Sequence, residues 1–412
     1  MTMRRLALAG LIAVAACGTA SSPGTPTELT QLPRPLSSAE RTVATAGNQF
    51  AFSLLSRLAG AQRGENVFVS PVSASMALGM LLNGAAGSTA TEMRGALSLG
   101  NAPLAEVNQG YHDLMALLRG LDSSVELRVA NGVWVDPSIP LQPAFVQAAK
   151  QWFDADARVM DFANPATITA INDWVSQQTN GRIRTIMDDA TGEEVMALAN
   201  AVYFKGRWRK TFDAAQTVDA PFRGADGVER QVKLMTAPKD GFSYGEADGA
   251  QVAELGYGAN AWSMVVVLPR EGTGASDFAA GLTPAKWEAL LQGLRPGGSV
   301  ELRLPRFRLE YKRTLNDDLE ALGMKQAFVP DGADFTGMSP LGKQLFVTFV
   351  TQKTFVEVNE EGTEAAAATG VGIGVTSMPP AMTVNRPFVV AIRERLTGTI
   401  LFVGVINKLP GT

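Results

Sequence analysis

The feature that most constrains this chain lies near its C-terminal end, between residues 360 and 384 (EEGTEAAAATGVGIGVTSMPPAMTV). Its Gly, Ala, Thr and Pro content, without an aromatic residue, is typical of an exposed loop. The first half nevertheless alternates with a strict period of two, which is what a strand buried in a sheet requires. One face carries Thr363, Ala365, Ala367, Thr369, Val371, Ile373 and Val375, and the other carries Glu364, Ala366, Ala368, Gly370, Gly372, Gly374 and Thr376.

Two interpretations of this stretch remain open. Either it is a glycine-rich loop that alternates by accident, or it is a loop in one state of the protein and a strand in another. The residues from Thr363 to Val375 would make a strand of roughly 40 Å at about 3.3 Å per residue. The small residues from Gly362 to Ala368 would let a sheet open around them without clashes. The preceding segment, Phe355–Val358, is itself a strong strand candidate.

The composition excludes several classes of function. With 412 residues, 46% of them hydrophobic and 18% charged, the chain can form a soluble globular domain with a large core. A formal charge of −4 offers no basic surplus for a nucleic-acid partner. One histidine, His112, and one cysteine, Cys17, cannot build a disulfide or a Cys/His metal site, so we expect no metal and no cofactor. A Ser-His-Asp triad would need His112, and no nucleophile motif accompanies it, so the chain is not expected to be an enzyme.

The N-terminal residues predict export. Residues 1–16 combine Arg4 and Arg5 with a short apolar run, as in a signal peptide. Val14 to Gly18 resembles the bacterial lipoprotein box, in which the signal is cut before the cysteine and Cys17 receives lipid. The alternative is an ordinary signal peptide cut after Ala15. We therefore expect a protein that is lipid-anchored on the outer face of a bacterial membrane, or secreted, with residues 17–40 as a flexible tether.

Residues 41–410 are predicted to form one α+β domain, in which helices come first and strands follow. Ser37 and Glu40 predict a capping box for a helix to about Leu58. Ser70-Pro71 predicts the start of a second helix, and Thr89 with Glu92 the start of a third. We expect further helices near 143–153, 167–177, 284–292 and 314–322, and strands at Glu126–Val135, Met196–Phe204, Ala261–Leu268, Val300–Leu309, Lys343–Val358 and Pro387–Val390.

A set of motifs in this domain resembles the serpin family, in order and from about residue 41 to 410. The matching segments are Asn66–Ser73, Asn83–Met93, Asn200–Trp208, Asp334–Met338, Glu360–Ala367, Asn385–Phe388 and Leu401–Gly404. The resemblance implies the serpin fold, with mixed β-sheets, about eight to nine helices and an exposed reactive loop. It also implies a suicide-substrate inhibitor of serine proteases, whose cut loop inserts into the central sheet and traps the acyl-enzyme.

The resemblance also assigns residues within the loop. Counting forward from Glu360 and backward from Phe388 gives the same reactive bond, Thr376–Ser377. The hinge is assigned to Glu360, Gly362, Thr363, Ala365, Ala366, Ala367 and Ala368. Its small side chains favour insertion, and it holds neither a proline nor a charge on the inward face. This favours an inhibitor over a non-inhibitory serpin that acts as a carrier, storage protein or chaperone.

Two further groups follow from the resemblance. Trp208 and Arg306, together with Glu360, resemble the cluster where loop insertion begins, although Arg306 is equally well interpreted as a solvated charge. Ser70, Ser73 and Asn200 resemble the polar cluster beneath the centre of the sheet. Gln352 stands where the family usually has a histidine, and a glutamine does not titrate near neutral pH.

The loop sequence narrows the expected partner. No Lys or Arg lies between Lys353 and Arg386, which disfavours a trypsin-like pocket. No aromatic residue lies between Phe355 and Phe388, which disfavours a chymotrypsin-like slot. Thr376 is small, so we expect a covalent acyl complex with an elastase-like or subtilisin-like serine protease. We also expect the protein to be a monomer.

Overall fold

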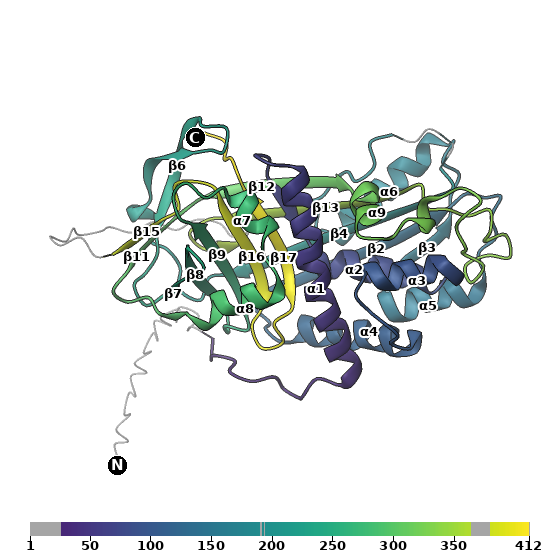
Figure 1. Ribbon diagram of the computed structural model, residues 1–412, viewed down its shortest axis with the longest axis horizontal. Helices are drawn as coiled ribbons and strands as arrows, with labels where there is room; N and C mark the ends of the chain where they lie inside the picture. The colour runs from purple at the N-terminus through teal and green to yellow at the C-terminus, as the bar shows by residue number, and fades with distance from the viewer. Residues whose placement is uncertain (1–25, 190–191, 193, 364–379, 412) are drawn as a thin grey trace, which may run out of the picture.

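The structure is a computed structural model that describes residues 26–189, 192, 194–363 and 380–411. This part of the chain forms nine α-helices and three β-sheets (Figure 1), so the predicted α+β class and helix number are confirmed. The helices are α1 (Ser38–Ala61), α2 (Pro71–Leu82), α3 (Gly87–Ala96), α4 (Leu104–Gly120), α5 (Pro143–Phe153), α6 (Pro165–Gln178), α7 (Ala275–Ala280), α8 (Pro284–Gln292) and α9 (Asn316–Ala321).

The six-stranded sheet contains Gly362 and Thr363, at the start of the alternating segment, as a short strand between two longer ones. Its strands, in spatial order, are β12 (Phe307–Thr314), β13 (Phe349–Val358), β14 (Gly362–Thr363), β4 (Met196–Arg207), β2 (Val125–Val135) and β3 (Asp156–Val159). The neighbours β13 and β4 pair directly and in parallel from Phe349↔Ala197 to Thr354↔Val202. Beyond that point the two strands part, and β14 lies between them.

Two smaller sheets complete the fold. The seven-stranded sheet contains β1 (Val67–Val69), β17 (Ile400–Ile406), β16 (Phe388–Glu394), β9 (Trp262–Pro269), β8 (Ala250–Tyr257), β7 (Phe242–Ala247) and β10 (Arg295–Pro296). The four-stranded sheet contains β15 (Ala381–Thr383), β11 (Glu301–Pro305), β6 (Glu229–Thr236) and β5 (Val218–Arg223). β15 follows the alternating segment in the sequence and pairs in parallel with β11, so this sheet holds the chain after that segment.

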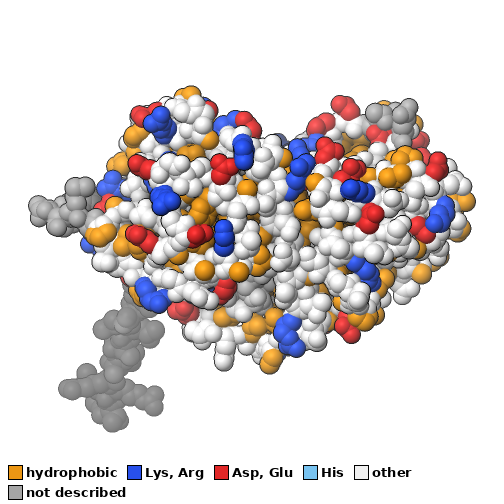
Figure 2. Space-filling view, in the orientation of Figure 1, with side chains coloured by type: hydrophobic (Ala, Val, Ile, Leu, Met, Phe, Trp, Pro, Cys, Tyr) orange, Lys and Arg blue, Asp and Glu red, His pale blue; other side chains and the backbone are white. Residues whose placement is uncertain are grey.

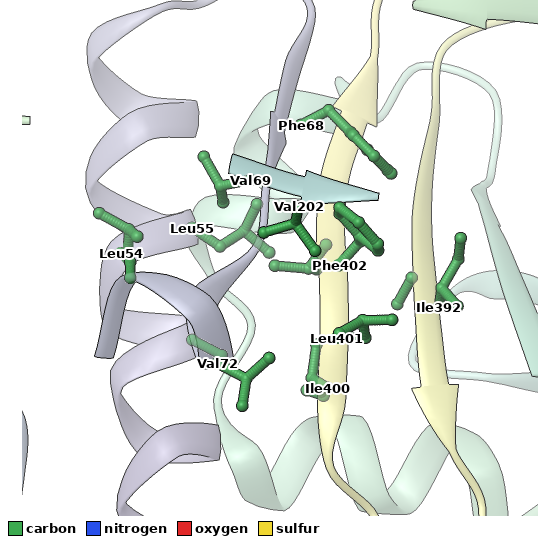
Figure 3. Close-up of a cluster of buried hydrophobic side chains, with 14 of the residues drawn as sticks. Leu54, Leu55, Phe68, Val69, Val72, Val202, Ile392, Ile400, Leu401 and Phe402 are labelled. Atoms are coloured by element: carbon green, nitrogen blue, oxygen red, sulfur yellow. The ribbon is translucent and has the colours of Figure 1, made fainter. Parts of the chain in front are cut away.

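The main core lies where α1 and α2 meet the two larger sheets. Figure 3 shows Leu54 and Leu55 of α1 beside Val72 of α2 and Phe402 of β17. Phe68 and Phe402 stack with their ring centroids 5.1 Å apart. The six-stranded sheet also has a second, smaller core on its other face, where Ala197, Ala199 and Ala201 of β4 share a cluster with residues of α6. Small residues on that face of β4 let α6 pack close to the sheet.

The element predictions from sequence were right in most cases and wrong in three. Ser37 and Glu40 form the predicted capping box, and Pro71 opens α2. Thr89 and Glu92 do not cap α3, which begins earlier, at Gly87; both accept hydrogen bonds from distant loops instead. The single strand predicted for 300–309 is two strands, because the chain breaks between β11 and β12 after Pro305. The strand predicted for Lys343–Val358 begins only at Phe349, because the chain from 343 to 348 is a turn and an irregular segment.

The described part of the tether is docked on the body. Leu29 donates its backbone N–H to Ala259 at 2.7 Å, and Glu28 accepts a hydrogen bond from Asn260 at 2.5 Å. Arg209 donates to the carbonyl of Pro26 at 2.8 Å. The Pro- and Thr-rich composition predicted a flexible tether, but these hydrogen bonds hold residues 26–29 against the surface of the folded domain. Cys17 and the rest of the predicted signal and tether lie outside the described residues.

Charges of both signs are mixed on the face of the molecule that Figure 2 shows, with Lys and Arg interspersed among Asp and Glu. Within the described ranges, no helix is long and apolar enough to cross a membrane. In the same residues, no cluster of His, Cys, Asp and Glu is placed to hold a metal ion.

Candidate functional site

The candidate site is the point where β13 and β4 part. Gly362 and Thr363 form the short strand β14, which is antiparallel to both neighbours. Thr363 lies opposite Val358 of β13 and Gly206 of β4. The first residues of the alternating segment therefore already occupy the sheet, whereas the sequence predicted a loop at this position. The remaining loop residues, including the predicted hinge alanines Ala365–Ala368 and the predicted reactive bond Thr376–Ser377, lie outside the described residues.

The local sequence explains why β14 fits. A Cβ atom on Gly362 would stand 2.1 Å from the Gly206 carbonyl oxygen and 2.7 Å from the Arg207 Cα, so only glycine can approach β4 this closely. Thr363 is 1% exposed, and its hydroxyl lies 2.7 Å from the Tyr257 hydroxyl. The buried threonine is thus satisfied by a partner in the seven-stranded sheet.

An aromatic cluster supports this contact. Trp208 stacks on Tyr257, with ring centroids 4.5 Å apart and planes 11° apart, and Phe212 packs against Trp208. Burial raises the pKa of Tyr257 far above its ordinary value, so the phenol stays neutral and free to hydrogen-bond with Thr363. The Trp208 indole donates to the Asn359 carbonyl at 2.8 Å. Trp208 therefore holds the turn that leads from β13 into β14.

The same turn is fixed by a buried carboxylate. Glu360 is 4% exposed and accepts hydrogen bonds from Arg306 at 2.7 Å and Thr217 at 2.5 Å. Burial acts to raise the pKa of Glu360, but the hydrogen bonds from Arg306 and Thr217 outweigh it and lower this pKa below its ordinary value. Arg306 is therefore not simply a solvated charge: it is the ion-pair partner of Glu360, as the family resemblance implied.

A second polar cluster lies under the centre of the sheet, where β13 and β4 are paired. Gln352 accepts from the Ser70 backbone N–H at 2.9 Å and donates to Asn200 at 2.8 Å. Asn200 in turn donates to Ser73 and to Asn131. All five residues are at most 1% exposed. The structure therefore brings the four predicted residues together, with Gln352 as the link between β13, β4 and the start of α2.

Sequence reasoning missed several residues of these clusters. Tyr257, Thr217 and Asn359 contact the hinge, and Asn131 completes the central cluster. No local pattern marks them, because each is a single polar or aromatic residue in or beside a strand and contacts residues far away in the sequence. Asn131 alone carried a signal: it is the polar residue in the otherwise apolar second half of β2, Val129–Val135.

Comparisons with known proteins identify the class to which this arrangement belongs. A family model described as serpin (serine protease inhibitor) matches residues 45–409. A serpin-like protein of Thermococcus kodakarensis is 36% identical over 373 residues, covering 89% of this chain and 85% of its own. The human leukocyte elastase inhibitor is 34% identical over 378 residues, covering 88% and 98%.

Solved structures agree with this assignment. The thermophilic serpin tengpin in its native state superposes with a TM-score of 0.82 at 30% identity, covering 93% of this chain and 97% of that chain. Human thyroxine-binding globulin complexed with its ligand gives a TM-score of 0.83 at 27% identity, covering 91% and 100%. The chain is a member of the serpin family. The predicted fold is thereby confirmed, as is the prediction that the chain is not an enzyme.

Loss of the Glu360 ion pair should change how stability depends on pH. Because the pKa of Glu360 is lowered in the folded protein, its contribution is present at neutral pH and is lost as the pH falls through that value. We expect Glu360→Gln to melt below the wild type at pH 7, with the difference shrinking as the pH approaches 3. Glu357→Gln, three residues earlier in the chain, is the matched control: Glu357 makes no ion pair among the described residues, so this variant should melt close to the wild type at pH 7. A wild-type minus Glu360→Gln difference that stays constant with pH would contradict the assignment.

Proposed function

We propose that this serpin is a suicide-substrate inhibitor of serine proteases. The observation that carries the proposal is β14, the two-residue strand that already lies antiparallel to β13 and β4 at the point where they part. If cleavage freed the following residues, they could extend β14 along the same direction. The extension would replace one parallel ladder, Phe349–Thr354 with Ala197–Val202, by two antiparallel ladders.

The register of β14 supports this path. Continued beyond Thr363, it would set Val371 opposite Leu198 and Val350, and Ile373 opposite Met196. Those three partners belong to the main core, so the apolar face of the alternating segment would meet apolar neighbours. Each aliphatic side chain buried in this way would contribute roughly 1.5–3 kcal/mol.

The same register gives the central polar cluster a role in insertion. Thr369 would come between Asn200 and Gln352, which hydrogen-bond to each other across the paired strands at 2.8 Å. A threonine hydroxyl donates and accepts, so it could satisfy both side chains once they separate. The only hydroxyl on this face between Thr363 and Val375 would thus fall where the sheet interior is polar.

A non-inhibitory carrier is the alternative, because the neighbouring thyroxine-binding globulin is a ligand complex of the same fold. A carrier has no need for a segment that can insert into the sheet. In this chain, small and apolar residues alternate from Thr363 to Val375, and β14 already lies between β13 and β4. We therefore favour inhibition through the bond Thr376–Ser377. The similarity to the human leukocyte elastase inhibitor and the small Thr376 favour elastase-like or subtilisin-like targets.

Incubation with a panel of proteases tests the function directly. We expect pancreatic elastase or subtilisin to form a complex that survives boiling in denaturant, with the released peptide beginning at Ser377 by mass spectrometry. Trypsin should be inhibited at least tenfold more slowly, because the loop offers no Lys or Arg. Catalytically inactive protease, lacking its serine nucleophile, is the control and should form no covalent complex. Cleavage of the loop without a stable complex, by every protease tested, would refute inhibition.

A cation on the inward face of the hinge should convert the inhibitor into a substrate. Thr363→Arg would bury a charge beside Tyr257 without a partner, which would cost several kcal/mol and slow insertion until the acyl-enzyme hydrolyses. The protease should cut the variant without forming a stable complex. Cutting should raise the melting temperature of the wild type above that of the intact protein, but should not raise that of the variant. Glu364→Arg is the matched control: it puts the same cation one residue on, where the native residue is already charged. Equal inhibition by Thr363→Arg and the wild type would show that the inward face is assigned incorrectly.

We further propose that Cys17 attaches the protein to a membrane through lipid. The support is its position after Val14-Ala15-Ala16, at the one place where a lipoprotein box needs a cysteine. Expressed in a bacterial host, Cys17→Ser should lose labelling by fatty acid and partition into the aqueous phase of detergent. Thr19→Ser, a similar change outside the box, should leave both unchanged. An unlabelled wild type with a mature N-terminus at Ala16 would favour the ordinary signal peptide.

A further inference from the structure

An arginine-lined cleft lies on the side of the molecule where β5, the loop between β9 and α7, and the start of β16 meet. It has a volume of about 620 Å³ and adjoins a second cleft of about 610 Å³; the two share Arg270, Glu271 and Arg386. The lining of the first cleft includes the loop from Gly272 to Gly274, whose small side chains take up little of the space. None of the described hinge residues and none of the central-cluster residues lines either cleft, so the clefts lie apart from the two clusters described above.

The charges of the first cleft do not balance. Four arginines line it, against Glu271 and Asp277. Arg63 pairs with Asp277 at 2.9 Å, which leaves Arg223, Arg270 and Arg386 against Glu271 alone. In the described chain, none of these three arginines forms an ion pair. The cleft therefore carries a surplus of two positive charges on a protein whose formal charge is −4.

Arg386 is the least compensated of the three. It is partly buried at the junction of the two clefts; one terminal nitrogen donates to the Pro269 carbonyl at 3.0 Å, and the other makes only a 3.5 Å contact with Asn385. Its Nε is buried and has no hydrogen-bond partner among the described residues. Burial lowers the pKa of Arg386, with the nearby Glu271 only partly opposing this effect. A buried guanidinium without a carboxylate partner is stabilised by an anion that approaches its remaining donors.

Arg270 lines the same two clefts as Arg386, and a hydrogen bond holds its backbone in place. The backbone N–H of Arg270 donates to the Gly249 carbonyl at 2.9 Å, and its guanidinium lies over Gly249, 3.6 to 3.7 Å from where a Cβ would stand. Gly249 has a φ of +72°, which a residue with a side chain rarely adopts, so this platform favours glycine. The side chain of Arg270 is exposed and makes no polar contact with the described residues, which leaves its donors available to a ligand.

We propose that this cleft binds a phosphate monoester, with Arg270 and Arg386 on the phosphoryl oxygens and Arg223 at the rim. A monoester is close to a dianion at neutral pH, which matches the surplus of two charges, and its tetrahedral oxygens suit the planar forks of arginine. Arg386 follows β15 by three residues, so the ligand would also fix the segment through which the reactive loop rejoins the body.

Binding of glycerol 3-phosphate, measured by calorimetry at low ionic strength on the full chain, tests the site. We expect binding to the wild type and at least tenfold weaker binding to Arg270→Gln and to Arg386→Gln. Arg303→Gln is the matched control, since Arg303 is a half-exposed arginine paired with Glu301 on β11, and it should bind as the wild type does. Because the Arg270 side chain is exposed, its variant keeps the test valid even if Arg386→Gln fails to fold.

Vesicles distinguish the source of the monoester. Co-sedimentation with vesicles containing phosphatidic acid, lost in Arg270→Gln and absent with phosphatidylcholine alone, would identify a lipid headgroup; binding of soluble ester without co-sedimentation would identify a free one. The proposal is overturned if neither ligand binds, or if both arginine variants bind as tightly as the wild type. Inhibition of a protease by Arg270→Gln at the wild-type rate would show that this site and the inhibitory function are independent.

Discussion

Strands β4 and β13 hydrogen-bond to each other as parallel neighbours only between Ala197–Val202 and Phe349–Thr354, and the rest of the proposed mechanism depends on this incomplete pairing. A parallel ladder is slightly less stable per residue than an antiparallel one. Above it, Thr363 already makes the antiparallel contacts that a full extra strand would make, with Val358 on one side and Gly206 on the other. The antiparallel pairing that the proposed mechanism requires is therefore already present at one end of the sheet. In that mechanism, its extension would require the segment to be released from its connection to β15.

The two polar clusters would affect loop insertion at two different places in the sheet. At the end of the sheet, Glu360 and Arg306 hold the turn before β14, and their ion pair weakens only when the carboxylate is protonated. At the centre, Gln352 and Asn200 hold the paired strands together through a hydrogen bond between two neutral amides. Since an amide does not titrate, protonation can loosen the hinge without loosening the centre. Any acid sensitivity of insertion would then originate at Glu360.

Much of the fold could be predicted from the sequence because its signals are local. The capping box at Ser37 and Glu40 marks α1, and runs rich in apolar residues mark β2, β4 and β9. The roles of Thr89 and Glu92 could not be predicted, because partners far away in the sequence determine them: Glu92 accepts from the backbone N–H groups of Lys325 and Gln326, and Thr89 accepts from that of Asp334. Motif similarity gave Trp208, Arg306, Asn200 and Gln352, whereas Tyr257 was missed, since its contact with Thr363 joins two different sheets.

The early placement of Gly362 and Thr363 also bears on which step limits insertion. A strand that enters a fully paired sheet must first separate its two neighbours. Here β13 and β4 are already apart where Thr363 lies between Val358 and Gly206. The next residues meet no paired backbone until Thr354 and Val202, where the parallel ladder begins. Two residues further along that ladder lies the Gln352–Asn200 hydrogen bond, and Gln352 also ties β13 to the backbone of Ser70. We infer that separation of this buried cluster, rather than entry of the hinge, is the main barrier, because it must open before Thr369 can replace the lost partners.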